Sequence, residues 1–236
     1  MTVEDGVGMA EWEDWFVSTF ECEAILFDLD GVLVDSTAVV VRTWREWAEA
    51  RDLDAERLLE VAHGRRTAEI VRLFAPDLDA DSEARELERI EANDLDGVLE
   101  IEGARELLSS LPADGWTVVT SGTRVLASKR MEHVGLPLPE RFVSADDVEN
   151  GKPHPEAYLK GAEVLGVRPE ACVVIEDAPS GVSSARSAGM RVIAVATTYG
   201  EEDLEEADAV ATSLASIRPS LQPESGARFE LQVMTG

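Results

Sequence analysis

The alternation of apolar and polar positions divides the chain into strands and helices. Short apolar runs with the length of buried strands lie at 24–27, 116–120, 171–175 and 190–196, with weaker signals at 142–144 and near Ala209. Segments with helical spacing lie at 103–111, 123–134, 156–165 and 180–188. Because strands that alternate with helices form parallel sheets with right-handed crossovers, this pattern predicts an α/β fold with a Rossmann-like parallel sheet.

The segment between the first two predicted strands has a different pattern. It contains no strand signal from about residue 37 to 101, and helical spacing is found at 36–50, 58–74 and 81–99, with Ser36 as a helix cap. The segment 37–101 is therefore predicted to be an all-helical cap. The remaining predicted parts are a core of 21–36 and 102–220, a tail or extra helix at 1–20, and a tail at 221–236.

Polar residues follow three of the predicted strands and occupy one loop: Asp28 and Asp30, Thr120 and Ser121, Glu176 and Asp177, and Lys152. The carboxyl ends of parallel strands meet at one edge of a sheet, where ligands bind. Asp28 and Asp30 share one side of the strand end, and two close carboxylates are costly unless a cation lies between them. Carboxylates, hydroxyls and a lysine at one edge are suited to Mg²⁺-assisted phosphoryl transfer.

The charge of the chain limits its partners. With 48 acidic and 21 basic residues, the formal net charge is −27. Such a charge repels nucleic acid and anionic membranes, so neither is an expected partner, and a phosphate site needs local positive charge. Cys22 and Cys172 border predicted strands and are expected to be small buried residues. Two cysteines are too few for a disulfide framework, which suits a reducing cytoplasm. We expect a cytoplasmic monomer or weak homodimer without a signal peptide or membrane span.

Four short motifs occur in order: Asp28-Leu29-Asp30-Gly31, Val118-Val119-Thr120-Ser121-Gly122, Gly151-Lys152-Pro153 and Val174-Ile175-Glu176-Asp177. They resemble the four motifs of the haloacid dehalogenase superfamily, and the resemblance covers about residues 22–215. It implies a Mg²⁺-dependent enzyme in which Asp28 is the nucleophile and Asp30 is first the general acid and then the general base. The segment 37–101 resembles the mobile helical C1 cap of this superfamily.

The same resemblance implies roles for the remaining motif residues. Thr120 and the backbone amide of Ser121 would hold the phosphate, and Lys152 would bridge Asp28 and the phosphate. The implied ligands of Mg²⁺ are Asp28, the backbone carbonyl of Asp30, Asp177 and Glu176, the last directly or through water.

Each of these residues also has a plainer interpretation. Thr120 and Ser121 are also suited to capping the helix at 123–134, and Lys152 to a solvated loop position. Glu176 and Asp177 are also suited to the start of a helix, where the macrodipole favours acidic side chains. The convergence of all of them favours a catalytic site over these separate structural roles.

Longer runs resemble those of the glycerol-phosphate and 2-deoxyglucose-6-phosphate phosphatases: Ala62-His63-Gly64-Arg65-Arg66-Thr67 in the cap, Thr120-Ser121-Gly122-Thr123-Arg124, and residues 151–161. They imply a small sugar or polyol phosphate as substrate. His63, Arg66 and Arg65 are candidates to reach the substrate from the cap. Their alternative role is surface charge, with the arginines paired to Glu69 or Glu60.

Three other functions fit the sequence less well than a phosphatase does. The superfamily's dehalogenases lack the second aspartate, which is present here as Asp30. Its phosphoglucomutases carry a histidine twelve residues after the nucleophile, where this chain has Val40. A non-catalytic phosphoryl-accepting protein would not need a general base beside its aspartate. The sequence therefore favours a phosphatase, with a phosphomutase and a phosphoryl-accepting or binding protein as alternatives.

Overall fold

The computed structural model describes residues 16–62, 64–222 and 227–235. Its centre is a parallel sheet of five strands in the order β5-β2-β6-β7-β8. The bounds are β2 Ala24–Phe27, β5 Trp116–Val118, β6 Cys172–Glu176, β7 Arg191–Val195 and β8 Ala209–Ala211. The predicted α/β fold with a parallel sheet is confirmed. The expected strand at 142–144 is reduced to a single bridge between Val119 and Val143.

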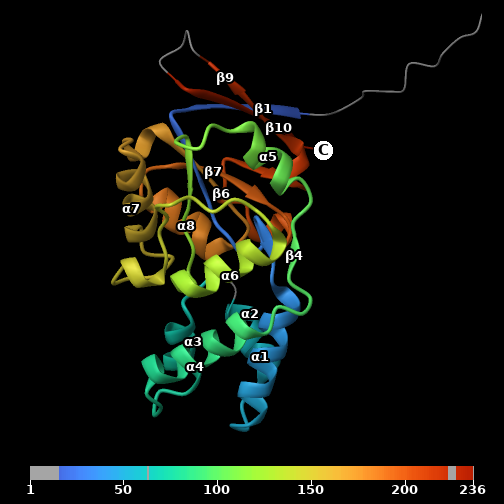
Figure 1. Cartoon of the computed structure of the whole chain (residues 1–236), viewed down its shortest axis with the longest axis vertical. Coiled ribbons are helices and arrows are strands. Elements are labelled where there is room, and N and C mark those ends of the chain that lie inside the picture. The colour runs from blue at the N-terminus through green and yellow to red at the C-terminus, as the bar shows by residue number, and fades with distance from the viewer. Residues whose placement is uncertain (1–15, 63, 223–226, 236) are drawn as a thin grey trace, which may run out of the picture.

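Helices cover both faces of this sheet (Figure 1). They are α5 Ala104–Ser110, α6 Arg124–Val134, α7 Glu156–Leu165 and α8 Pro179–Ser187. Successive side chains of a strand point to opposite faces. Ile25 and Phe27 accordingly join the apolar core with α5 and α6, while Ala24 and Leu26 join the core with α7 and α8. The continuous apolar strands therefore reflect burial on both sides.

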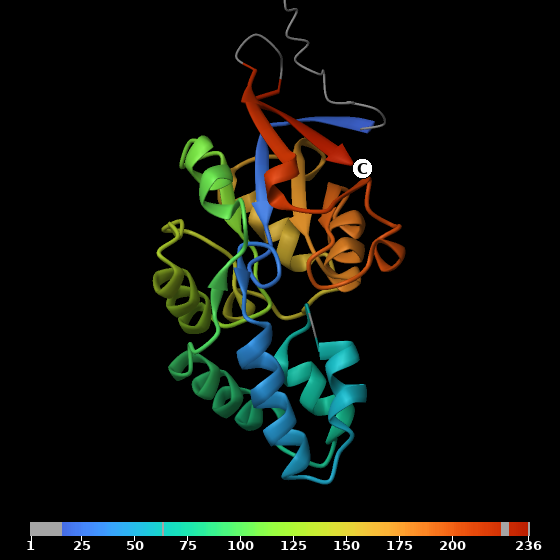
Figure 2. The ribbon, with the colours of Figure 1, turned by 90° about the vertical axis from the view of Figure 1, so that its right-hand side faces the viewer.

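The segment 37–93 forms four helices at one end of the molecule (Figure 2). They are α1 Thr37–Glu49, α2 Ala55–Ala62, α3 Thr67–Phe74 and α4 Ala80–Asn93. They enclose an apolar cluster of their own, which includes Trp44, Leu58 and Ile70. The chain enters and leaves this cap through two short strands that pair antiparallel, β3 Val34–Asp35 and β4 Leu99–Glu100.

Two helices of the cap are shorter than expected. The stretch 58–74 was predicted as one helix, but α2 ends at Ala62 and Gly64 adopts a positive φ of 75° before α3 begins. The helix predicted over 81–99 ends at Asn93, and Gly97 follows with a φ of 84°. Glycine adopts this left-handed conformation at little cost, so these two positions redirect the chain where the apolar spacing alone predicts a continuing helix.

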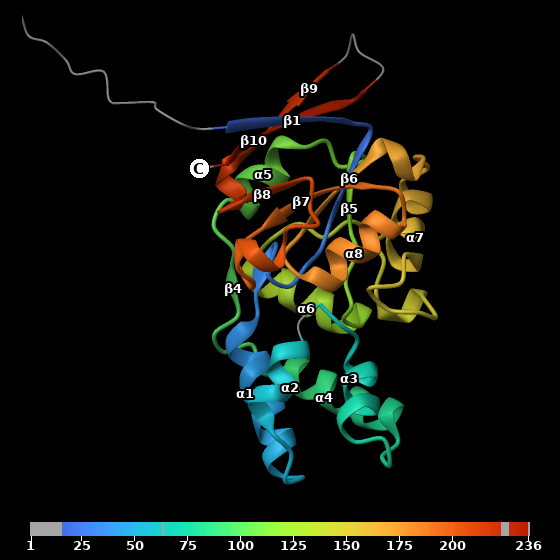
Figure 3. The same ribbon diagram turned by 180° about the vertical axis from the view of Figure 1, so that it is seen from behind.

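Both predicted terminal segments need correction. Part of the expected tail or helix at 1–20 is strand β1 Phe16–Cys22, and part of the expected tail at 221–236 is strand β10 Phe229–Thr235. Together with β9 Ile217–Leu221 they form an antiparallel sheet in the order β1-β10-β9, at the end opposite the cap (Figure 3). β1 and β10 lie at opposite ends of the described chain and pair with each other. The sequence pattern of either segment alone therefore does not show that it is a strand. No helix in the described segments is long and apolar enough to cross a membrane.

Candidate active site

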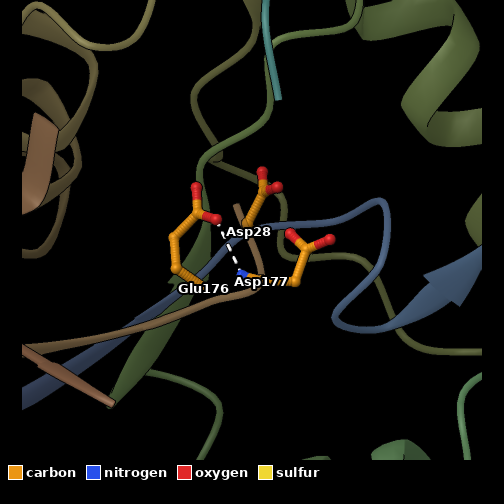
Figure 4. Close-up of side chains that lie close together, drawn as sticks. All are labelled: Asp28, Glu176 and Asp177. Atoms are coloured by element: carbon orange, nitrogen blue, oxygen red, sulfur yellow. Dashed lines mark hydrogen bonds between the residues drawn. The ribbon is translucent and has the colours of Figure 1, made fainter. Parts of the chain in front are cut away.

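Three carboxylates converge at the carboxyl edge of the central sheet. Asp28 follows β2, Glu176 ends β6 and Asp177 comes directly after it, and all three are buried (Figure 4). Parallel pairing of Phe27 with Ile175 brings the two strand ends side by side. One oxygen of each carboxylate lies within 4.8 Å of the others, so the three side chains could hold one metal ion.

Lys152 supplies the positive charge of this cluster. Its ammonium group donates to Asp28 Oδ1 at 2.8 Å, to Glu176 Oε1 at 2.7 Å and to the carbonyl of Val119 at 3.2 Å. Burial raises the pKa of Asp28 to about 7, and Lys152 opposes this increase. Burial by itself would lower the pKa of Lys152, but the carboxylates of Asp28 and Glu176 together raise it, so the lysine stays charged. Its complete burial excludes the solvated loop position.

Glu176 is held by four hydrogen bonds. Its Oε1 accepts from Lys152 and from the Tyr158 hydroxyl at 2.9 Å, and its Oε2 accepts from the backbone N–H groups of Asp177 at 2.8 Å and Ala178 at 2.9 Å. Burial disfavours its charged form, but Lys152 and these donors lower the pKa of Glu176 overall. Both oxygens are thus engaged within the protein. This geometry suits Glu176 to fixing Lys152 more than to binding a metal directly.

Asp177 has the opposite environment. Its Oδ1 is buried and has no hydrogen-bond partner among the described residues. Burial, together with the charges of Glu176 and Asp28, raises the pKa of Asp177 well above its usual value. A buried, unpartnered carboxylate oxygen is costly unless a cation neutralises it. The donor set of Asp28 and Asp177 therefore fits a hard divalent cation such as Mg²⁺, which prefers oxygen ligands.

A small cavity of about 80 Å³ opens above these carboxylates, between core and cap. Its core lining is Asp28, Asp30, Ser36, Thr120, Ser121, Gly122, Leu126 and Arg130, and its cap lining is Val40, Trp44, Ala62, Gly64, Arg65, Thr67 and Glu91. The volume is well below the roughly 300–1,000 Å³ of pockets for drug-sized ligands. The enclosed space thus suits a small ligand that contacts both parts of the chain.

Thr120 and Ser121 both face this cavity, as a phosphate-binding pair must. The Thr120 hydroxyl accepts from the N–H of Gly122 at 3.1 Å, and the Ser121 hydroxyl donates to the carbonyl of Gly64 in the cap at 2.9 Å. The residue at the start of α6 is Thr123, which makes no side-chain capping bond. The alternative in which Thr120 and Ser121 only cap this helix is therefore wrong.

The three candidate cap residues have different positions. Arg65 lines the cavity. Arg66 instead donates to the backbone carbonyls of Glu149 at 2.9 Å and Ala145 at 3.3 Å, so its guanidinium fastens the cap to the core outside the cavity. His63 lies outside the described residues. Of the two described candidates, Arg65 therefore lies where it can contact a substrate, and Arg66 has a different set of partners.

Sequence reasoning missed the residues that hold Asp30. Asp30 Oδ1 accepts from the Ser36 hydroxyl at 2.7 Å and from Arg130 Nη1 at 2.7 Å, and Arg130 Nη2 donates to Glu91 Oε2 at 2.6 Å. Ser36 thus makes no side-chain capping bond to α1, contrary to expectation. The polar positions Arg130 and Glu91 within predicted helices were the available signal, but helical spacing alone does not show that they face each other.

A capped parallel sheet with acidic residues at its carboxyl edge defines a class of α/β hydrolases, and comparison with known proteins narrows this class. The family model for haloacid dehalogenase-like hydrolases matches residues 25–195. The chain belongs to the haloacid dehalogenase-like hydrolase family, which confirms the resemblance seen in its motifs.

Relatives with assigned activities include phosphatases of small polyols. The chain is 44% identical to Hexitol phosphatase A of Escherichia coli over 207 residues, which cover 86% of this chain and 96% of that protein. It is 37% identical to Glycerol-1-phosphate phosphohydrolase 2 of Saccharomyces cerevisiae, over 85% of this chain and 86% of that protein. Among solved structures, a β-phosphoglucomutase from Clostridium difficile matches with a TM-score of 0.73 at 25% identity, over 84% of this chain and 93% of that one.

Proposed function

We propose that the protein is a magnesium-dependent phosphomonoesterase that hydrolyses a small sugar or polyol phosphate through an aspartyl-phosphate on Asp28. The observation that carries this proposal is the placement of Asp28 between a buried lysine and a buried, unpartnered Asp177 oxygen, in the lining of the cavity between core and cap. Lys152 occupies Asp28 Oδ1. Among the described residues, Asp28 Oδ2 receives no hydrogen bond, so it is the oxygen available for attack on phosphorus.

The reaction then needs two proton transfers, and we assign both to Asp30, which lines the cavity beside Asp28. When Asp28 forms its bond to phosphorus, the bond from phosphorus to the leaving alcohol oxygen breaks, and Asp30 gives that oxygen a proton. Water next attacks the phosphorus and gives a proton back to Asp30, and inorganic phosphate and free Asp28 are formed. Thr120 and the Ser121 amide hold the phosphate oxygens, while Lys152 offsets negative charge beside Asp28.

Asp28, Asp177 and the backbone carbonyl of Asp30 are the groups that would hold Mg²⁺. When bound, the ion would lower the repulsion between the nucleophile and an anionic phosphate. Glu176 would act on the same centre through Lys152, which it holds at 2.7 Å.

The substrate class is supported by the cavity and by the relatives. The small volume of the cavity leaves little room beyond a phosphate and a few carbon atoms. Polar groups such as Arg65 and Thr67 line its cap side and are suited to hydroxyl groups. The names of two relatives refer to the phosphates of a hexitol and of glycerol.

The test is a panel of sugar and polyol phosphates assayed for phosphate release with Mg²⁺. We expect multiple turnovers on small polyol phosphates, no turnover after chelation of the metal, and recovery when Mg²⁺ is added back. Asp28→Asn should lower kcat by at least about 1,000-fold, because the nucleophile is lost. Turnover by Asp28→Asn at the wild-type rate would contradict the proposal, and so would single-turnover phosphate release, which a phosphoryl-accepting protein would show.

A phosphomutase is the second candidate, because the fold matches that of a β-phosphoglucomutase. In the present chain Val40, and no histidine, lines the cavity from the first cap helix. The two activities differ in the acceptor of the phosphoryl group. Transfer from the phospho-enzyme to a second sugar hydroxyl faster than to water would favour the mutase.

A further inference from the structure

Arg130 is a buried cation that has no role in the reaction steps proposed above. It lies on α6 with only 3% of its surface exposed, and a guanidinium in such a position requires partners of opposite charge. These partners come from two separate parts of the chain. Asp30 belongs to the loop after β2, whereas Glu91 belongs to α4 of the cap and is itself 5% exposed.

The contact with Arg130 determines which Asp30 oxygen is available. Arg130 and Ser36 both donate to Oδ1, each at 2.7 Å. No hydrogen bond to Oδ2 is found within the described part of the chain, and the Asp30 side chain is 30% exposed where it borders the cavity. Fixing one oxygen in this way orients the other toward the space in which the leaving oxygen and water must lie.

Glu91 completes the arrangement from the cap side. Its Oε2 accepts from Arg130 Nη2 at 2.6 Å, so the guanidinium is held between the cap and the Asp30 carboxylate. The planar guanidinium reaches both carboxylates through different nitrogens, a geometry that a lysine ammonium does not reproduce.

We propose that Arg130 is a positioning residue: it orients the Asp30 carboxylate for proton transfer, and Glu91 keeps it in place when the cap is closed. The orientation of the Asp30 carboxylate thus depends on residues of both the core and the cap. The inference rests on the proposed phosphatase function, to which it adds a specific dependence of the acid and base on the cap.

The test compares two substrates whose leaving groups differ. A polyol phosphate needs a proton on its departing oxygen, whereas 4-nitrophenyl phosphate releases a stabilised phenolate without one. The value of kcat/KM contains only the steps up to release of this group. We expect Arg130→Met combined with Glu91→Gln, which leaves no unpaired buried charge, to lower kcat/KM about 100-fold for the polyol phosphate and less than about 3-fold for the aryl phosphate. Asp30→Asn should show the same selectivity.

Lys129→Met is the matched control, because Lys129 lies on the same helix and also contacts the cap, at Asn93 Oδ1, but does not touch Asp30. It should change neither value more than about 2-fold. An equal loss on both substrates in the double variant would indicate a merely structural role and would overturn the proposal, as would no loss at all.

A crystal structure of the double variant provides a readout that needs no activity. We expect the Asp30 carboxylate to leave its present orientation or to occupy several. An unchanged Asp30 carboxylate would overturn the positioning role, even if wild-type enzyme hydrolysed none of the phosphates. The absence of any hydrolysis by the wild type would refute the proposed function alone, and the structure of the variant would still decide the role of Arg130.

Discussion

At the scale of single residues, the site depends on groups that touch no substrate. Gly181 is an example, because it lies beside the carboxylate that holds Lys152. A Cβ atom at this position would lie 1.6 Å from Glu176 Oε1, closer than any real contact. The hydrogen bonds that Lys152 and Tyr158 donate to Glu176 therefore require the absence of a side chain at position 181 of α8.

We expect Gly181→Ala to displace Glu176 and to lower kcat/KM at least about 10-fold, because Lys152 loses one of its two carboxylate partners. The measurement is steady-state kinetics on a polyol phosphate together with urea unfolding. Ser184→Ala on the same helix is a suitable control: it removes a hydrogen bond to the carbonyl of His154 but does not touch Glu176. Equal kcat/KM values for Gly181→Ala and the wild type would show that Glu176 does not need this space.

Glu91 gives a prediction for the pH dependence of stability. Burial, opposed by Arg130, raises the pKa of Glu91 to about 7, compared with about 4.3 in an unfolded chain. Between these values the folded protein binds more protons than the unfolded one, so this residue lowers the free energy of unfolding as the pH rises, by up to about 4 kcal/mol. Glu91→Gln cannot titrate and should lack this contribution.

Urea unfolding of the wild type and of Glu91→Gln at pH 5 and pH 8 measures this effect. The difference in unfolding free energy between the two proteins should shift in favour of Glu91→Gln at pH 8. Parallel pH dependences of the two proteins would contradict the expectation.

At the scale of elements, the strands β1, β9 and β10 stabilise the core by packing against it. Phe229, Leu231 and Val233 alternate along β10 and are fully buried in the same apolar cluster as Phe27. Pairing with β1 on one side and β9 on the other fixes this strand. The two ends of the chain thus stabilise the sheet from the side remote from the cavity (Figure 3).

Leu231→Ala should lower the free energy of unfolding by about 2–5 kcal/mol, because it leaves a cavity in this cluster. We expect kcat/KM to remain within about 2-fold of the wild type, since β10 contributes no residue to the site. Gln232→Ala, an exposed neighbour on the same strand, should change stability by less than about 0.5 kcal/mol. Denaturant unfolding and kinetics on the three proteins decide between these outcomes, and a loss of activity without a loss of stability would contradict them.

The sequence predicts local and strongly patterned features of this chain well. The buried strand at Ala24–Phe27 and the helix that ends at Gly135 are found where their patterns indicate. Contacts between distant segments could not be predicted in the same way. The pairing of β1 with β10, and the meeting of Glu91 with Arg130, depend on tertiary packing, which no local period encodes.

At the scale of the whole molecule, the positive charge is placed against a strongly acidic background. The chain carries a net charge of −27, yet Lys152 and Arg130 are buried at the site and Arg65 lines the cavity. An anionic substrate would be repelled by most of the surface, and the cations at this position offset part of that repulsion. The acidic composition, which disfavours polyanionic partners, is therefore compatible with a phosphate site.

The paired strands β3 and β4 also have a consequence for how such enzymes diversify. Because Asp35 lies opposite Leu99, the cap leaves and rejoins the core at adjacent points. A different cap can be spliced in at this junction without moving the catalytic strands. On the proposal above, a graft of this kind would also have to carry an acidic side chain to face Arg130, because Glu91 of the present cap supplies that contact.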